Sequence, residues 1–205
     1  MQVIMVRHGE SHWNVEHKYQ GQLDSGLTER GRMQARRAAN VLVEEVDQAR
    51  VVWSSDLPRA RDTAQAYADL TGATVIEDVR LRELGVGSWS GRTLAEIAEE
   101  FPDVVAASAA GQDVRRGGGE TFAEQRDRVV ACLDEISAED LDTALVFSHG
   151  GAIRVAAAHA AGVPSPGHYT MSPPSNCSRT VLQLGTAGNK LVRYNIGLPG
   201  VEETY

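Results

Sequence analysis

The chain has 205 residues, of which 42% are hydrophobic and 23% charged, as is usual for a globular protein. Its net charge of -8 repels nucleic acid and anionic membranes at long range, and we expect neither as a partner. No apolar run approaches the roughly 20 residues that span a bilayer. The N-terminus opens into an apolar strand rather than a signal peptide, and two cysteines are too few for a disulfide framework. We therefore expect a cytoplasmic protein with a single domain over residues 1–205.

Strands and helices are predicted to alternate along the first part of the chain. Residues 2–6 are an apolar run that predicts a buried strand. Apolar residues at helical spacing, after a threonine that suits an N-cap, predict a helix over about 29–46. Pro58 suits the first turn of a second helix, which Gly72 ends. Two more short strands are predicted at 51–53 and 74–76.

The same alternation returns in the second half of the chain. The predicted elements there are a helix over 121–136, a strand over 144–147, an alanine-rich helix over 151–161 and strands over 181–184 and 191–194. The last two strands, joined near Gly188, predict a terminal hairpin. Alternation of this kind indicates an α/β fold with a mainly parallel central sheet and helices on both faces.

The segment 102–120 interrupts this pattern. Within it, residues 115–119 have neither helical nor strand periodicity, and three successive glycines there predict a flexible loop. The lysine and the serine or threonine of a P-loop are missing beside those glycines. We therefore expect 102–120 to be an insertion that acts as a lid over the site.

Chemically active side chains follow each of the predicted parallel strands. Arg7 and His8 come after the first strand, Arg59 after the second, Glu83 after the third and His149 after the fourth. Ligands of open α/β sheets bind beyond the carboxyl ends of the strands, so these side chains are predicted to share one rim.

Such a rim suits phosphoryl transfer. Neutral imidazole is a competent nucleophile near pH 7, so one histidine could attack the phosphorus. Arg7, Arg59 and a protonated His149 would supply the positive field, because guanidinium forks match phosphate oxygens. Glu83 could protonate the leaving oxygen, provided that its surroundings raise its pKa.

Several segments together resemble the histidine phosphatase superfamily, also called the phosphoglycerate-mutase-like family, and in particular its phosphatase branch. The segments that carry the resemblance, all in the family's order, are 7–14 (RHGESHWN), 27–31 (LTERG), 54–64 (SSDLPRARDTA), 81–91 (LRELGVGSWSG), 118–121 (GGET) and 148–151 (SHGG). The resemblance implies the three-layer sandwich of that family. The family usually has proline before Leu27, where this chain has Gly26, and we expect that departure to loosen the loop over the site.

The resemblance also implies roles for individual residues. His8 would be the phosphorylated histidine and Glu83 the proton donor. Catalytic His149 would also hold the phosphate, together with Arg7, Asn14 and Arg59. The residues implied to lie near the substrate are Ser11, Gln20 and Gly21.

The predicted function is hydrolysis of a small phosphorylated metabolite through a phosphohistidine. Residues 20–24 look similar to the actinobacterial phosphatases of phosphorylated sugar acids such as glucosyl-3-phosphoglycerate, while α-ribazole phosphate and phosphoglycerate stay open as substrates. A phosphoglycerate mutase and a non-catalytic sensor of phosphate esters are the alternatives. The sensor would be expected to have lost His8, Arg59 or Glu83, and all three are present.

Metal-dependent catalysis is the main alternative to the histidine mechanism. His8 and His12 are four residues apart, but they follow a strand and do not share a helix, and no compact cluster of aspartate and histidine appears. We therefore expect metal-independent catalysis with no cofactor. Trp13, Trp53 and Trp89 are expected to be packing residues rather than platforms for a substrate. Relatives in this family often form dimers, so the resemblance leaves a homodimer open.

Overall fold

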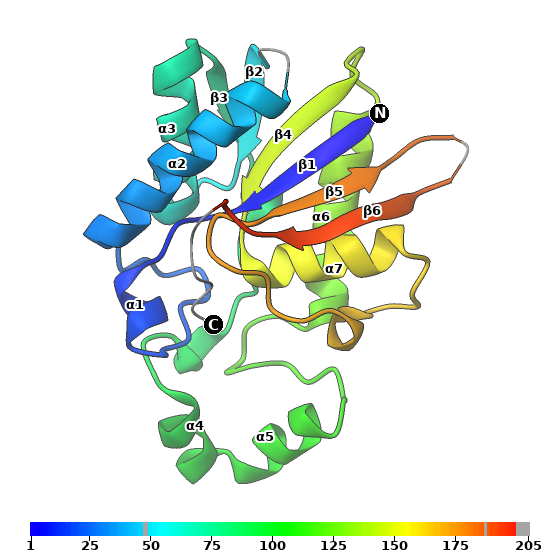
Figure 1. The fold of residues 1–205 in the computed structure, drawn as a ribbon. Coiled ribbons are helices and arrows are strands. Elements are labelled where there is room, and N and C mark those ends of the chain that lie inside the picture. The colour runs from blue at the N-terminus through cyan, green and yellow to red at the C-terminus, as the bar shows by residue number, and fades with distance from the viewer. Residues whose placement is uncertain (47–48, 187, 200–205) are drawn as a thin grey trace.

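One mixed sheet organises the molecule. The computed structural model describes residues 1–46, 49–186 and 188–199. Within them six strands form a single sheet in the order β3-β2-β4-β1-β5-β6 (Figure 1). The strands β1 to β4 are parallel, whereas β5 is antiparallel to both β1 and β6. The bounds are β1 (Gln2–Arg7), β2 (Val51–Ser54), β3 (Thr74–Glu77), β4 (Thr143–Ser148), β5 (Arg179–Gln183) and β6 (Lys190–Ile196).

Helices cover both faces of this sheet, so the predicted three-layer fold is confirmed (Figure 1). Helices α2 and α3 pack together on one face, and α6 and α7 pack together on the other. The α-helices are α1 (His12–Val15), α2 (Glu29–Glu45), α3 (Pro58–Thr71), α4 (Leu94–Glu100), α5 (Pro102–Ala109), α6 (Phe122–Ser137) and α7 (Gly150–Ala160). Short 3-10 turns cover Val79–Leu81, Gly87–Trp89 and His168–Thr170. No helix among the described residues is long and apolar enough to cross a membrane.

The central strand β1 shows why both faces need a cover. Its side chains alternate, so that Ile4 and Val6 join the apolar cluster on the α2–α3 side while Val3 and Met5 join the cluster on the α6–α7 side. A strand that is buried on both faces has a continuous apolar sequence, and the apolar run over residues 2–6 predicted β1 for this reason.

The structure departs from the predicted elements beyond the carboxyl ends of β1 and β4. Helices α1, α4 and α5 lie there, and the sequence analysis predicted none of them (Figure 1). Helix α5 takes up the first part of the 102–120 segment, where no helix was expected, because Pro102 opens it and Val104 and Val105 pack on the core cluster. Helices of four to eight residues carry too few apolar positions to show a clear period. Residues 115–119 lie outside helices and strands, as predicted.

Candidate active site

The two histidines of the predicted site come from neighbouring strands. Arg7 of β1 lies opposite Ser148 of β4 in the parallel register, and the residue after each is a histidine. The backbone N–H of His8 donates to the Ser148 carbonyl at 3.0 Å. The imidazole rings of His8 and His149 consequently lie 5.2 Å apart between centroids, and both are buried.

The His8 ring is oriented as a nucleophile. Its Nδ1 lies 2.7 Å from the Gly9 carbonyl oxygen, which can only accept a hydrogen bond, so Nδ1 carries the proton and Nε2 keeps its lone pair. Burial lowers the pKa of His8 well below its usual value, and the nearby charges of Arg59 and Arg7 lower it further. His8 is therefore a neutral imidazole, and no described residue forms a hydrogen bond with its Nε2.

The state of His149 differs from the sequence-based prediction. Burial lowers the pKa of His149 well below its usual value, and Arg59 and His8 add to that effect, so the ring is neutral in the free enzyme rather than protonated. Its Nε2 lies 2.8 Å from the hydroxyl of Ser55, which also accepts from the Leu57 N–H. A hydroxyl donates one hydrogen bond, and His149 Nε2 is the one acceptor for the Ser55 proton among the described residues, so with that proton directed at Nε2 the N–H of the ring lies on Nδ1. That Nδ1 is buried without a partner among the described residues.

Arg59 lies at the start of α3 and is tied to the loop that follows α1. Its Nη1 donates to the Asp24 carboxylate at 3.0 Å and to the Leu23 carbonyl at 2.7 Å, and its Nη2 donates to the Gly21 carbonyl at 2.8 Å. The side chain is 1% exposed, and its Nε has no partner within the described ranges. These bonds fix the loop beside the pocket and place Gly21 in the pocket wall.

The expectation that Gly26 loosens this loop is wrong. Gly26 has a φ of +74°, and its N–H donates to Asp24 Oδ2 at 2.8 Å. Proline has a φ near -65° and no N–H, so it could supply neither feature. Asp24 thus joins Gly26 to Arg59, and the loop is fastened by a contact that depends on the glycine.

Asn14 and Ser11 have different structural roles. Ser11 is completely buried and caps α1, and its N–H and hydroxyl both donate to Asn14 Oδ1. Asn176 also donates to that oxygen, so the carboxamide oxygen is fully used and the NH2 group is the end left for a ligand. Asn14 lines the pocket, whereas Ser11 and His149 are buried behind its lining residues, and their places near the substrate stay predictions.

Glu83 is held by four hydrogen bonds on its carboxylate. Its Oε1 accepts from the Leu84 N–H at 2.8 Å, from Gln125 Nε2 at 3.1 Å and from the Gly151 N–H at 3.1 Å. Its Oε2 accepts only the second branch of the Gly151 N–H bond, also at 3.1 Å, among the described contacts. The two oxygens of Glu83 are therefore in different environments.

These groups surround a pocket of about 210 Å³. The predicted residues in its wall are Arg7, His8, Asn14, Gln20, Gly21, Arg59 and Glu83. The wall also contains cationic and aromatic side chains that were not predicted from the sequence: Lys18, Tyr19, Arg116, Phe122 and Arg154. Two guanidinium groups lie by the Phe122 ring, with the Cζ of Arg116 at 4.7 Å from the centroid and that of Arg154 at 5.8 Å.

The sequence contains only weak indications that Arg116 and Arg154 belong to the site. Arg154 is the one charged residue of an otherwise alanine-rich helix, α7, which begins directly after His149. A charge in an apolar helix is a usable hint of a site. Arg116 lies in the glycine-rich segment, and no pattern connects it with α7.

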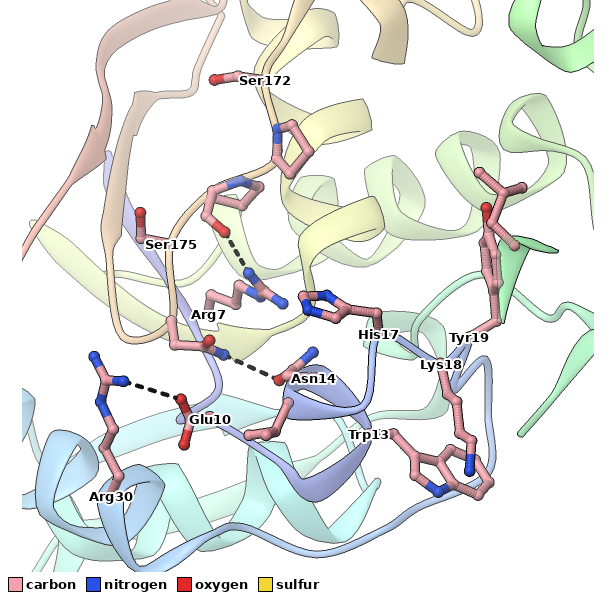
Figure 2. Close-up of a pocket in the computed structure, with 15 residues that line it drawn as sticks. Arg7, Glu10, Trp13, Asn14, His17, Lys18, Tyr19, Arg30, Ser172 and Ser175 are labelled. Atoms are coloured by element: carbon pink, nitrogen blue, oxygen red, sulfur yellow. Dashed lines mark hydrogen bonds and ion pairs between the residues drawn. The ribbon is translucent and has the colours of Figure 1, made fainter. Parts of the chain in front are cut away.

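A wider groove of about 710 Å³ adjoins the pocket and shares Arg7, Asn14, Lys18 and Tyr19 with it. Figure 2 shows Ser172 and Ser175 across this groove from α1. Arg7 lies between the two walls and donates to the Pro174 carbonyl at 2.5 Å. Trp53 and Trp89 are buried, as expected of packing residues, whereas Trp13 lines the groove. Space for a leaving group much larger than phosphate is thus present beside the pocket.

Groups of three or more histidine, cysteine, aspartate or glutamate residues placed to hold a metal ion do not occur among the described residues. The positive charge that faces the pocket comes from arginine and lysine side chains.

Comparisons with known proteins give a consistent result. The sequence profile described as histidine phosphatase superfamily (branch 1) matches residues 3–197. A glucosyl-3-phosphoglycerate phosphatase from Mycolicibacterium vanbaalenii is 36% identical over 173 residues, which cover 79% of this chain and 75% of that protein. A probable phosphoglycerate mutase, GpmB, from Escherichia coli is 38% identical over 169 residues, which cover 80% of this chain and 77% of that one.

Among solved structures, a mycobacterial glucosyl-3-phosphoglycerate phosphatase in complex with VO3 matches with a TM-score of 0.87 and 32% identity. The match covers 96% of this chain and 99% of that one.

Proposed function

Since this chain belongs to branch 1 of the histidine phosphatase superfamily, we propose that it hydrolyses phosphomonoesters through a phosphohistidine formed on His8. The chain is an enzyme, a phosphoric monoester hydrolase. The observation that carries the proposed mechanism is the orientation of His8, whose Nδ1 proton is held by the Gly9 carbonyl while Nε2 has no partner among the described residues.

In the first step the phosphate of the substrate binds with Arg7, Arg59, the Asn14 NH2 group and the Nδ1–H of His149. Neutral His149 can donate this hydrogen bond, so no imidazolium is required. The lone pair of His8 Nε2 forms a bond to phosphorus while the bond from phosphorus to the ester oxygen breaks. The departing oxygen takes the proton of Glu83. The positive charge that develops on the His8 ring is stabilised by the hydrogen bond from Nδ1 to the Gly9 carbonyl.

In the second step water attacks the phosphohistidine. The Glu83 carboxylate takes a proton from that water, the bond between phosphorus and Nε2 breaks, and the electron pair returns to the ring. Inorganic phosphate leaves, and His8 is neutral again. These steps use protein side chains and water alone, so we propose that catalysis is independent of metal ions.

The proposed substrate is a phosphorylated sugar acid, such as glucosyl-3-phosphoglycerate. Two relatives with that substrate in their names support it. Arg7 and Arg59 are sufficient to bind the phosphate, and the pocket wall has two further arginines, Arg116 and Arg154. A carboxylate on the leaving group would form ion pairs with these two. The adjoining groove has room for the sugar.

We also infer that residues 102–120 act as a lid. Helix α5 lies beyond the carboxyl ends of β1 and β4, and Arg116 reaches the pocket wall from the same segment (Figure 1). Tyr169 ties the segment to the rest of the protein, because its hydroxyl lies within hydrogen-bond distance of the Ser108 and Gln112 carbonyls.

A phosphoglycerate mutase is not favoured over a phosphatase. The structures that match over nearly the whole chain with TM-scores up to 0.87 include phosphatases, although GpmB proteins are among the sequence relatives. Cytoplasmic location and the absence of nucleic-acid and membrane partners stay predictions, as does a homodimer.

The test is phosphate release from a panel of phosphomonoesters in excess EDTA, with His8→Ala beside the wild type. The panel contains glucosyl-3-phosphoglycerate, 3-phosphoglycerate, α-ribazole phosphate and glycerol 3-phosphate. We expect release that EDTA does not change, that His8→Ala abolishes and that is fastest with the sugar acid ester. Release abolished by EDTA, or retained by His8→Ala, would contradict the mechanism, and preference for an ester without a carboxylate would contradict the substrate class.

A further inference from the structure

A glutamine occupies a core position of helix α6. The buried positions of α6 include Phe122, Val129 and Ile136, and Gln125 shares their face with 0% exposure. A buried amide is unfavourable unless it is hydrogen bonded. Gln125 Nε2 donates to Glu83 Oε1 at 3.1 Å and lies 3.4 Å from the Arg82 carbonyl, while Gln125 Oε1 is buried with no partner in the described part of the chain. Its best hydrogen bond is thus to the acid of the site.

Gln125 is not needed to hold the backbone that carries Glu83. Arg128, one turn along α6, donates to the Arg80 and Arg82 carbonyls at 2.8 Å and to the Glu83 carbonyl at 2.9 Å. The contact that Gln125 adds is therefore the one to the Glu83 side chain.

The hydrogen bonds divide the Glu83 carboxylate into a held oxygen and an open one. Three donors converge on Oε1, from Leu84, Gln125 and Gly151, so it has little capacity left. A Cβ built on Gly150 would lie 3.9 Å from Oε2 and 3.6 Å from Arg7 Nε, so Oε2 faces the side on which Arg7 lines the pocket. The oxygen with free capacity is the one on the phosphate side.

From this geometry we propose that Gln125 is a positioning residue, which holds Glu83 Oε1 so that Oε2 carries the proton that passes to the leaving group. The proposal rests on the proposed function, because it assigns the proton transfer to Glu83. An amide suits this place, since it donates without adding a charge beside a carboxyl group that must gain and lose a proton.

The test uses Gln125→Leu, which keeps a side chain of similar size and removes both polar atoms. We measure the single-turnover release of the leaving group from glycerol 3-phosphate and from 4-nitrophenyl phosphate, together with the melting temperature. We expect alcohol release to slow about tenfold or more, because general acid catalysis contributes 100-fold or more. Release of 4-nitrophenol should change by less than about twofold, since that leaving group needs little protonation, and the melting temperature should be equal or higher because an unpaired buried oxygen is removed.

Two further variants separate positioning from packing. Gln125→Glu places a second carboxyl group next to Glu83. Because two neighbouring negative charges repel each other, we expect the fall in rate on the alkaline side of the pH profile to move up by about one pH unit or more. Val129→Ala removes packing from the same face of α6 without a contact to Glu83, and its losses should be equal for the two esters.

Two outcomes would overturn the proposal. If Gln125→Leu releases both leaving groups at the wild-type rate, the hydrogen bond from Gln125 to Glu83 does not contribute to catalysis. If both rates fall equally and the melting temperature is lower, the role of Gln125 is structural. A base-quenched phosphohistidine in the wild type, absent from His8→Ala, decides the proposed function separately. If that intermediate forms, either outcome concerns Gln125 alone.

Discussion

The backbone of Gly151 lies directly against the carboxylate of Glu83. Its N–H donates to both carboxylate oxygens at 3.1 Å, and a Cβ built on it would lie 2.3 Å from Glu83 Oε1. The second glycine after His149 therefore joins the start of α7 to the Glu83 carboxylate, which comes from the segment that follows β3. The close approach, rather than a special backbone angle, explains the need for glycine.

Gly151→Ala is expected to displace the Glu83 carboxylate from its position. Turnover of an alkyl phosphate should fall about 100-fold or more, because the general acid is lost, while 4-nitrophenyl phosphate should lose less in single-turnover release. Gly150→Ala is the matched control, since its Cβ would have ordinary contacts at 3.6 and 3.9 Å. Equal activities of the two alanine variants would show that Glu83 is not the acid.

His168→Phe is expected to make the protein less sensitive to acid. His168 stacks on Phe122 at 3.5 Å, and neither ring nitrogen has a partner among the described residues. Burial lowers its pKa to about 3, with Arg154 and Arg116 adding to the effect. The unfolded chain binds a proton there below about pH 6.5 and the folded chain does not, so the free energy of unfolding falls as the pH decreases.

Urea unfolding at pH 7.5 and 5.5 checks this prediction. From pH 7.5 to pH 5.5, the unfolding free energy of the variant should rise relative to that of the wild type by about 1.4 kcal/mol. The reason is that pH 5.5 lies about one unit below the pKa of histidine in the unfolded chain. A constant difference would mean that His168 is protonated in the folded protein at pH 5.5.

Much of the fold and the catalytic rim followed from local sequence. The continuous apolar run of β1 and the residues that follow each strand are local features, and they placed His8, Arg59 and Glu83 in the wall of one pocket. His149 lies beside His8 because of the parallel register, which strand alternation also predicts.

What escaped prediction depends on tertiary contacts. The neutral state of His149 follows from its burial beside Arg59. The role of Gly26 follows from a positive φ and a bond to Asp24. Gln125 occupies an ordinary core position of a helix, and its importance appears only once Glu83 is found next to it.

Gly26→Pro, which restores the residue usual in the family, is expected to weaken this enzyme. It removes the N–H bond to Asp24 and forces φ away from +74°, so the loop held by Arg59 should shift. We expect an increase in KM of about tenfold, which corresponds to about 1.4 kcal/mol of binding. Gly26→Ala, for which a Cβ meets nothing within 4 Å, should cost about 1–2 kcal/mol of stability and less in KM. An unchanged KM in the proline variant would show that the loop does not contribute to binding.

Arg116→Met is expected to lower the preference for substrates with a carboxylate. Arg116 lines the pocket that also contains Glu83. Its neighbour Arg115 bonds to Gly119 and Glu124 on the surface and provides the matched control as Arg115→Met. KM for 3-phosphoglycerate should rise about tenfold in Arg116→Met, because a hydrogen bond between charged groups contributes about 1.5–3 kcal/mol. KM for glycerol 3-phosphate, which has the same phosphate and no carboxylate, should change less than about twofold. Equal increases for both esters would assign Arg116 to the transferred phosphate, and Arg154 and Lys18 would then be the cations of the pocket wall left to recognise the acid.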